Sequence, residues 1–267
     1  MKPESMTSLE RVLTTLGFKE PDRVPYFLLL TMHGAKELGL SIKEYFAHSK
    51  NVVEGQLRMR KKYRHDCYYP FFYAGIEVEA WGGEVIFTED GPPNAGDPIL
   101  KKFEDIDSFS PPQIQDNAPL QKVLSAINGL YEKNQGDAPI IGVVMSPFSL
   151  PVMQMGFEKY LDLMHEQPDK FEKLMKVNEL FCVEWANAQL AAGATAICYF
   201  DPVSSSTIVT PEQYRKYGKM IAKSTIAQIK GPTATHFASG QCSSIVADVA
   251  ETGTAIIGIS ALEDPVE

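Results

Sequence analysis

The hydrophobic positions of the chain follow two alternating patterns, helical spacing and short apolar runs. Thr7–Glu10 and Ser41–Glu44 are each a capping box, in which hydroxyl and carboxylate oxygens accept hydrogen bonds from the free amides of a helix start. The second box opens a helix that we expect to run to about Arg64. The apolar runs predict strands buried on both faces, as in parallel sheets, and they begin near Val24, Asp66, Pro139, Ala196, Pro232 and Ala255.

Helical segments separate the later strands, over residues 119–135, 156–165, 168–192, 210–230 and 243–252. A strand–helix–strand order at intervals of about 30 residues or more predicts parallel strands joined by crossover helices. The sequence contains neither Gly-x-Gly-x-x-Gly nor a P-loop. This favours an α/β fold of the TIM (β/α)8-barrel type over a dinucleotide-binding sheet, with residues 1–267 as a single domain.

Residues 76–88 interrupt this order, because acidic and apolar residues alternate around Trp81-Gly82-Gly83. The alternation predicts a β-hairpin inserted into the barrel, with the glycines in its turn. Residues 90–112, rich in Pro, Asp and Gly, are predicted to be a loop. A domain linker is the alternative, but the order of strands and helices resumes unchanged after it.

Six strands account for the 267 residues, whereas a closed (β/α)8 barrel has eight. Because each βα unit takes about 30 residues, the barrel is predicted to lack its last two βα units. We therefore expect a fragment, a truncated chain, or a barrel whose open edge is covered by a partner.

Composition narrows the classes of partner. With 34 acidic and 25 basic residues the formal charge is −9, and 44% of the residues are hydrophobic, as in soluble globular proteins. The acidic balance disfavours nucleic acid or an anionic membrane surface as a partner. Four scattered cysteines and the lack of an apolar amino-terminal run predict a reduced, cytoplasmic protein.

Candidate chemistry lies where the predicted strands end, since barrel active sites form at the carboxyl ends. His236 and Cys242 are of the ligand types that zinc prefers, although a hydrogen-bonded loop histidine and a buried small residue fit the same spacing. Asp201 can orient a ligand, carry a proton or join a metal site, or it can simply form a turn. Tyr199 and Ser204 flank it and are candidate cofactor-binding residues.

Two further histidines are weaker candidates. His65 and Cys67 have the spacing of a metal pair, but they lie at the start of a predicted strand, on the face of a barrel that serves stability. We expect no metal there. His33 ends the first predicted strand and is a candidate pocket residue.

Residues 186–193 and 201–214 resemble the uroporphyrinogen decarboxylase superfamily, and within it the cobamide-dependent methyltransferases that act with coenzyme M or corrinoid proteins. The resemblance extends over essentially the whole chain and implies a TIM barrel. It is supported by three further stretches, residues 11–25, 79–84 and 236–253.

The resemblance also separates the branches of that superfamily. Decarboxylases carry an Arg-Gln-Ala-Gly-Arg motif after the first strand to hold substrate carboxylates, and here residues 30–36 contain no arginine. The methyltransferase branch binds zinc through His-x-Cys. His236 matches the first ligand, but Ala238 stands at the second position. Either Cys242, or a carboxylate such as Asp201 or Glu263, completes the site, or the metal site is lost or altered.

The resemblance implies a corrinoid-dependent methyltransferase with Asp201 and His236 as catalytic residues. It would move a methyl group between a cobamide, carried by a partner corrinoid protein, and a small thiol or methylated donor, assisted by zinc at His236 and Cys242. Two alternatives remain. One is a decarboxylase-like enzyme for another carboxylate, anchored by Asp201. The other, suggested by Ala238, is a degenerate, non-catalytic binding barrel.

Overall fold

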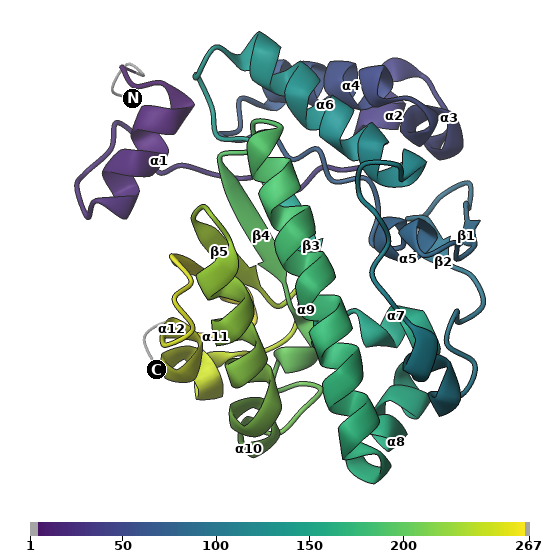
Figure 1. The fold of residues 1–267 in the computed structure, drawn as a ribbon. Coiled ribbons are helices and arrows are strands. Elements are labelled where there is room, and N and C mark those ends of the chain that lie inside the picture. The colour runs from purple at the N-terminus through teal and green to yellow at the C-terminus, as the bar shows by residue number, and fades with distance from the viewer. Residues whose placement is uncertain (1–4, 265–267) are drawn as a thin grey trace.

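A parallel sheet of four strands, in the order β3-β4-β5-β6, forms the centre of the computed structural model, which describes residues 5–264 (Figure 1). The strands pair in sequence order, as successive βα units of a barrel do. They are β3 (Ile141–Met145), β4 (Ala196–Phe200), β5 (Thr233–His236) and β6 (Ile256–Gly258). All four coincide with strands predicted from the sequence.

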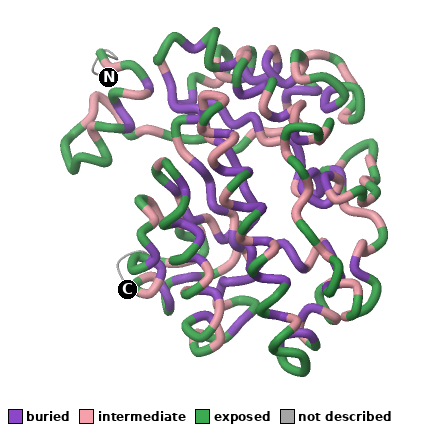
Figure 2. Tube along the Cα trace, in the orientation of Figure 1, coloured by how far each residue is buried: buried purple, intermediate pink, exposed green. Residues whose placement is uncertain are grey.

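Helices connect these strands across the outer face of the sheet (Figure 1). The long helix α9 (Pro168–Ala191) leads from the β3 side into β4, α11 (Lys219–Gln228) leads into β5, and α12 (Val246–Ala250) leads into β6. α9 packs against α11 and contacts both β3 and β4. The buried positions in Figure 2 follow this contact between α9 and the sheet.

A second group of helices comes before the sheet: α2 (His33–Leu38), α3 (Ile42–Ala47), α4 (Ser49–Tyr63) and α6 (Ala118–Asn134). α4 contacts both α2 and α6. Both predicted capping boxes are formed, at the starts of α1 (Ser8–Leu16) and α3.

The helix predicted from Ser41 to about Arg64 is in fact two helices. His48 has an extended backbone, with φ −133° and ψ 130°, and it separates α3 from α4. The sequence has neither Pro nor Gly at this point, so no breaker residue indicated the interruption.

Short elements complete the described chain. They are α5 (Ile76–Ala80), α7 (Pro151–Met155), α8 (Phe157–Glu166), α10 (Pro211–Gln213), the 3₁₀ turns η1 (Phe103–Ser108), η2 (Pro202–Ser204) and η4 (Ser243–Ile245), and the π-helical turn η3 (Tyr214–Gly218). No helix within residues 5–264 is long and apolar enough to cross a membrane.

The first two predicted strands are extended segments without a regular ladder, so their prediction as strands is wrong, although residues 66–72 are buried apart from Phe71. Residues 24–30 have no strand pairing, and Val24 is 79% exposed. Residues 66–72 pair with β3 through the single bridge between Tyr68 and Ile140. The Gln56 side chain joins the two segments instead, accepting from the Tyr69 N–H at 2.9 Å and donating to the Leu30 carbonyl at 3.1 Å.

Side chains also replace a partner strand along the free edge of β3. The Gln189 amide accepts from the Val143 N–H at 2.9 Å and donates to the Val143 carbonyl at 2.8 Å. The Glu77 carboxyl accepts from the Met145 N–H at 2.9 Å. Because buried backbone groups must find partners, these side chains let the neighbouring segment leave the sheet after Tyr68.

The hairpin predicted over residues 76–88 is also replaced by a different structure. Residues 76–80 form α5, and the Gly83 N–H donates to the Val78 carbonyl at 3.0 Å, so the glycines end a helix rather than turn a hairpin. The antiparallel pair that does form joins β1 (Val85–Ile86) to β2 (Asn94–Ala95), with residues 87–93 as its loop.

A buried charge cluster attaches α1 to the rest of the fold. The Asp66 carboxylate accepts from Arg11 and Arg23, both at 2.6 Å, from the Ser8 hydroxyl at 2.9 Å and from the Tyr26 N–H at 2.9 Å. Arg11 also pairs with Asp22. The hydrogen bond from Arg11, helped by the backbone N–H groups of Ser5 and Met6, holds the pKa of the Asp22 carboxyl well below its usual range. Burial raises the pKa of Asp66, but hydrogen bonds from Arg23, the Tyr26 N–H and Ser8 together bring it below the usual range.

We predict that Arg11→Ala lowers the free energy of unfolding by about 3–5 kcal/mol, because it removes the cation paired with the buried Asp22 carboxylate and one of the two cations around Asp66. Urea denaturation at pH 7 measures the change. The matched control is Arg58→Ala, which removes an exposed pair with Glu54 and is expected to cost less than about 0.5 kcal/mol. Equal losses in the two variants would contradict a structural role for the cluster.

Candidate functional site

The inner face of the sheet borders a cavity of about 300 Å³. Strand alternation sends Cys198 and Phe200 of β4 to this side, where they cluster with Val143 and Tyr69. Ile197 and Tyr199 point the opposite way, into the core with α9. The side of the sheet on which a residue lies therefore decides whether it can meet a ligand.

The lining of this inner cavity is almost wholly apolar. Its contributors include Leu9, Val12 and Leu13 of α1 and Phe27 and Leu29 of the first extended segment. The titratable residues in the lining are Cys67, Tyr69, Cys198 and His236. Burial raises the pKa of both thiols to about 12 and that of Tyr69 well above its usual value. Of these four residues, only His236 belongs to a residue type whose reference pKa is near neutrality.

His236 closes β5 at the carboxyl end and lies between Phe200 of β4 and Gly258 of β6. Its imidazole contacts the Phe200 ring, with ring centroids 5.6 Å apart. A Cβ on Gly258 would come within 3.1 Å of Nδ1, so glycine lets β6 pass close to the imidazole. Burial lowers the pKa of His236. The side chain is therefore a neutral imidazole at pH 7, able to accept a proton.

Asp201 lies directly after β4 but behind the cavity rather than in it. Its carboxylate is fully buried and accepts from Ser146 at 2.5 Å and from Ser149 at 2.7 Å, while its N–H donates to the His236 carbonyl at 2.8 Å. Burial raises the pKa of this carboxyl, and the serine hydroxyls oppose the shift. Asp201 thus links the ends of β3, β4 and β5.

The two residues predicted to bind a cofactor also lie behind the inner face. Tyr199 belongs to the outer core with α9 and is fully buried. Ser204 is fully buried as well, and a Cβ on Gly218 would approach its Oγ to 2.8 Å. Strand alternation alone would have separated Tyr199 from Cys198 and Phe200, but the side of the sheet that carries the cavity is a property of the fold.

Cys242 lies in a core cluster with Phe237, Ile245 and Val249. Burial raises the pKa of its thiol to about 11, and its Sγ lies 4.0 Å from the Gly258 carbonyl.

Glu263, the other alternative ligand, is already engaged by backbone. Its carboxylate accepts from the N–H groups of Cys242 and Ser243, at 2.8 and 2.7 Å. Within residues 5–264, no group of three or more His, Cys, Asp or Glu side chains comes together as a metal site. The described residues therefore do not supply a three-ligand zinc set around His236. The expectation that the pair His65 and Cys67 binds no metal stays a prediction.

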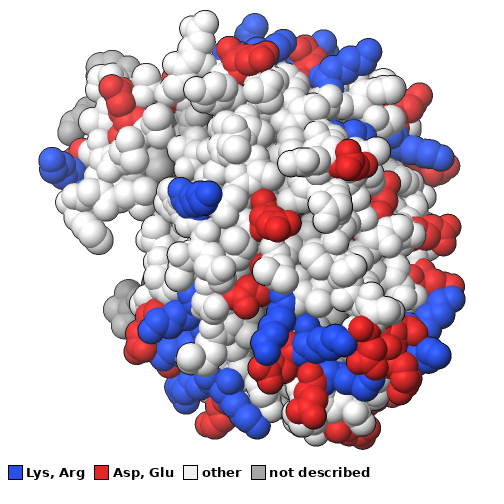
Figure 3. Space-filling view, in the orientation of Figure 1, with Lys and Arg blue, Asp and Glu red and all other residues white. Residues whose placement is uncertain are grey.

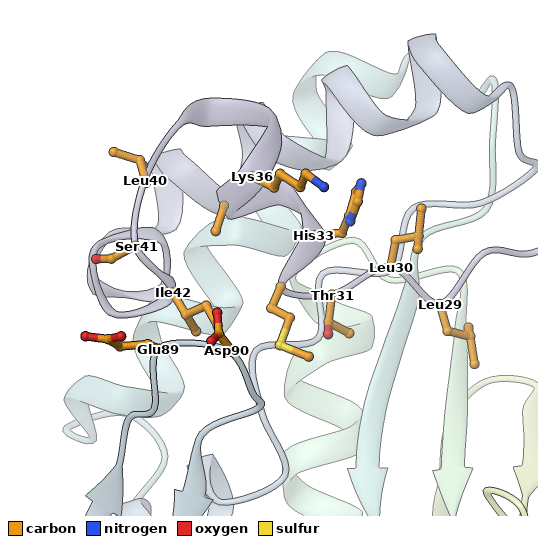
Figure 4. Close-up of a pocket in the computed structure, with 12 residues that line it drawn as sticks. Leu29, Leu30, Thr31, His33, Lys36, Leu40, Ser41, Ile42, Glu89 and Asp90 are labelled. Carbon is orange, nitrogen blue, oxygen red and sulfur yellow. The ribbon is translucent and has the colours of Figure 1, made fainter.

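A second cavity, of about 520 Å³, lies between α2, α3 and the loop that joins β1 to β2 (Figure 4). His33 and Lys36 of α2 line it, as do Glu89 and Asp90 of the loop. Leu29 lines both cavities, so they adjoin. Of these four titratable residues, only His33 was predicted from the sequence to be a pocket residue, because the others belong to no motif.

His33 is held in place by its neighbours. Its Nε2 lies 3.0 Å from the Tyr63 hydroxyl and 3.4 Å from the Glu37 carboxylate, which in turn accepts from Tyr63 at 3.0 Å. On the face of the molecule in Figure 3, acidic and basic side chains intermingle around extensive uncharged areas.

Parallel βα units with a cavity on the inner face of the strands are the arrangement of a TIM-barrel-type fold. The profile of the uroporphyrinogen decarboxylase (URO-D) family matches residues 7–267, and the chain belongs to that family. A methyltransferase from Methanosarcina mazei has a similar structure, with a TM-score of 0.83 at 21% identity over 95% of this chain and 76% of the other. The predicted fold class and superfamily are thereby confirmed.

Curated relatives come from both branches of the family. The methylcobamide:CoM methyltransferase MtaA of Methanosarcina barkeri is 28% identical over 49% of this chain. The methylated-thiol–coenzyme M methyltransferase of Methanosarcina mazei is 25% identical over 69%, and the uroporphyrinogen decarboxylase of Idiomarina loihiensis is 22% identical over 82%. The matches cover 38%, 49% and 63% of these three relatives.

The Glu77 carboxyl at the β3 edge gives a test of this architecture. Burial raises its pKa to about 8, so the folded protein holds a proton there that the unfolded chain releases near its usual value of 4.5. Stability from this group is complete below pH 4.5 and is lost as the pH rises through about 8. Between pH 6.5 and 8 the loss is expected to reach about 1.4 kcal/mol per pH unit.

Glu77→Gln mimics the protonated carboxyl and removes this dependence. Urea unfolding of both proteins at pH 6.5, 7.2 and 8 should show that the stability of the variant relative to the parent increases with pH. The histidines are the same in both proteins, so their contribution to the pH dependence cancels from this difference. Parallel curves would show that Glu77 is ionised in the folded protein.

Proposed function

We propose that this chain catalyses methyl transfer between a cobamide, carried by a partner corrinoid protein, and a small thiol or methylated donor. The observation that carries the proposal is the chemistry of the inner cavity, where a neutral imidazole faces an apolar space. Such a site suits an uncharged thiol and a methyl group, neither of which needs a cation to hold it. The similarity to two coenzyme M methyltransferases supports the same choice.

His236 is the residue to which we assign the proton transfer. In the thiol-methylating direction its imidazole accepts the S–H proton, because the surrounding apolar side chains keep it neutral before the reaction. The thiolate sulfur then forms the new S–C bond to the methyl group, and the electron pair of the broken bond stays with the cobamide. Asp201 holds the ends of β4 and β5 in register through its contact with the His236 carbonyl.

Zinc at His236 stays a prediction from the sequence resemblance. A catalytic zinc takes three protein ligands, whereas the Cys242 thiol lies in the core with a raised pKa and Glu263 caps backbone amides. No step above depends on zinc.

Decarboxylation of a porphyrinogen is the second candidate, and the family match and the Idiomarina relative favour it. A substrate with many carboxylates needs several cationic partners. Among the residues that line the two cavities there is no arginine, and Lys36 lines only the second cavity, together with the acidic Glu89 and Asp90. The charges present in these cavities therefore favour methyl transfer.

The test is incubation of the protein with methylcobalamin and an uncharged thiol such as 2-mercaptoethanol, followed by the visible spectrum of the cobalamin and by mass analysis of the thiol. We expect demethylation of the cobalamin with formation of the methyl thioether. Carbon dioxide release from uroporphyrinogen, without any methyl transfer, would overturn the proposal in favour of the decarboxylase.

We predict that His236→Asn lowers the rate of methyl transfer by about 100-fold or more, because it removes the proton acceptor. Its control is His165→Asn, which alters an exposed histidine of α8 and should leave the rate unchanged. The parent activity should also fall as the pH drops below the lowered pKa of His236. An unchanged rate in the His236 variant would remove this residue from the mechanism.

A further inference from the structure

The cavity of Figure 4 contains charges of both signs that do not neutralise each other. Lys36 contributes an ammonium from α2, and Glu89 and Asp90 contribute carboxylates from the β1–β2 loop. Within residues 5–264 none of the three side chains makes an ion pair or hydrogen bond. Elsewhere on the same helix and its neighbour, Glu37 does pair, with Lys62 at 2.7 Å.

The remaining lining of this cavity is largely apolar. Leu29, Leu30, Met32 and Ile42 provide most of the hydrophobic surface. The cavity volume of about 520 Å³ lies within the range typical of small-molecule sites, roughly 300–1,000 Å³. A ligand that fits this surface has a compact apolar body as well as charge.

Charge complementarity then selects among possible ligands. A simple anion would be attracted by Lys36 but repelled by Glu89 and Asp90. A simple cation would be attracted by the two carboxylates but repelled by Lys36. A molecule that carries both charges satisfies both sides of the cavity. We propose that this cavity binds a methylated zwitterion, a small carboxylate with a quaternary ammonium or tertiary sulfonium group.

The arrangement assigns a separate place to each part of such a ligand. Its carboxylate would pair with Lys36 and its onium group with Glu89 or Asp90, while its methyl groups would contact the apolar lining, which includes Met32 and Ile42. As a substrate assignment this rests on the proposed function: the onium methyl passes to the reduced cobamide, and the electron pair of the broken C–N or C–S bond leaves with the neutral amine or thioether. Leu29 connects this cavity to the one that holds His236.

Isothermal titration of the purified protein with three probes tests the binding. The probes are trimethylammonioacetate, tetramethylammonium, which has only the cation, and the anion of tert-butylacetic acid, which replaces the nitrogen of the first by carbon. We expect saturable binding of the zwitterion, at least about tenfold tighter than binding of either single ion. Equal affinity for all three probes, or no binding of the zwitterion, would overturn the proposal.

Charge-removing variants locate the site. Lys36→Met should weaken binding of the zwitterion about tenfold without weakening binding of tetramethylammonium. The double variant Glu89→Gln with Asp90→Asn should weaken both of these ligands but not the tert-butylacetate anion. Lys43→Met is the matched control, because Lys43 is an exposed residue of α3 outside the lining. A loss in the control equal to that of Lys36→Met would contradict the site.

The readouts separate this inference from the proposed function. Binding of the zwitterion without methyl transfer to cobalamin would support the site and count against the activity. Methyl transfer to a thiol by a protein that does not bind the zwitterion would support the activity and overturn the site.

Discussion

The buried carboxylate of Asp66 is the interaction on which the amino-terminal half of the structure depends. It receives hydrogen bonds from α1, from the loop before the first extended segment and from that segment itself. The two extended segments of this half have almost no strand ladder to hold them. Residues 24–30 have no strand pairing, and residues 66–72 have a single bridge. A carboxylate buried between two arginines is costly to disturb. The Asp66 cluster therefore fixes the position of α1, whose Leu9 and Val12 line the inner cavity.

A related constraint, that buried backbone groups need hydrogen-bond partners, shapes the free edge of the sheet beside β3. Gln56, Gln189 and Glu77 supply the hydrogen bonds that regular neighbouring strands would have made. Because side chains make these hydrogen bonds, residues 24–30 and 66–72 can turn away from the sheet, which a continuous strand ladder would prevent. The second cavity lies beyond this divergence, beside α2 and the β1–β2 loop, and the two cavities meet at Leu29.

Within the site, position on the sheet separates residues that are neighbours in sequence. His236 lines the inner cavity and contacts the Phe200 ring, whereas Tyr199 and Cys242 belong to core clusters outside it. Asp201 supports the site from behind through two serines. The candidate chemistry therefore reduces to one neutral imidazole in an apolar setting. Burial, rather than a charged partner, accounts for its lowered pKa.

The sequence by itself determined the βα order, the capping boxes at Thr7 and Ser41 and the four strands of the sheet, and it placed the candidate His236 at the end of a strand, because these depend on local periodicity and on residues that end strands. It did not determine the fate of residues 24–31, 66–72 and 76–88, where side chains distant in sequence replace the ladder. Nor did it show that Lys36, Glu89 and Asp90 share a cavity. Only the tertiary structure decided these points, because hydrogen bonds and charges from separate elements are brought together by packing, which no local pattern encodes.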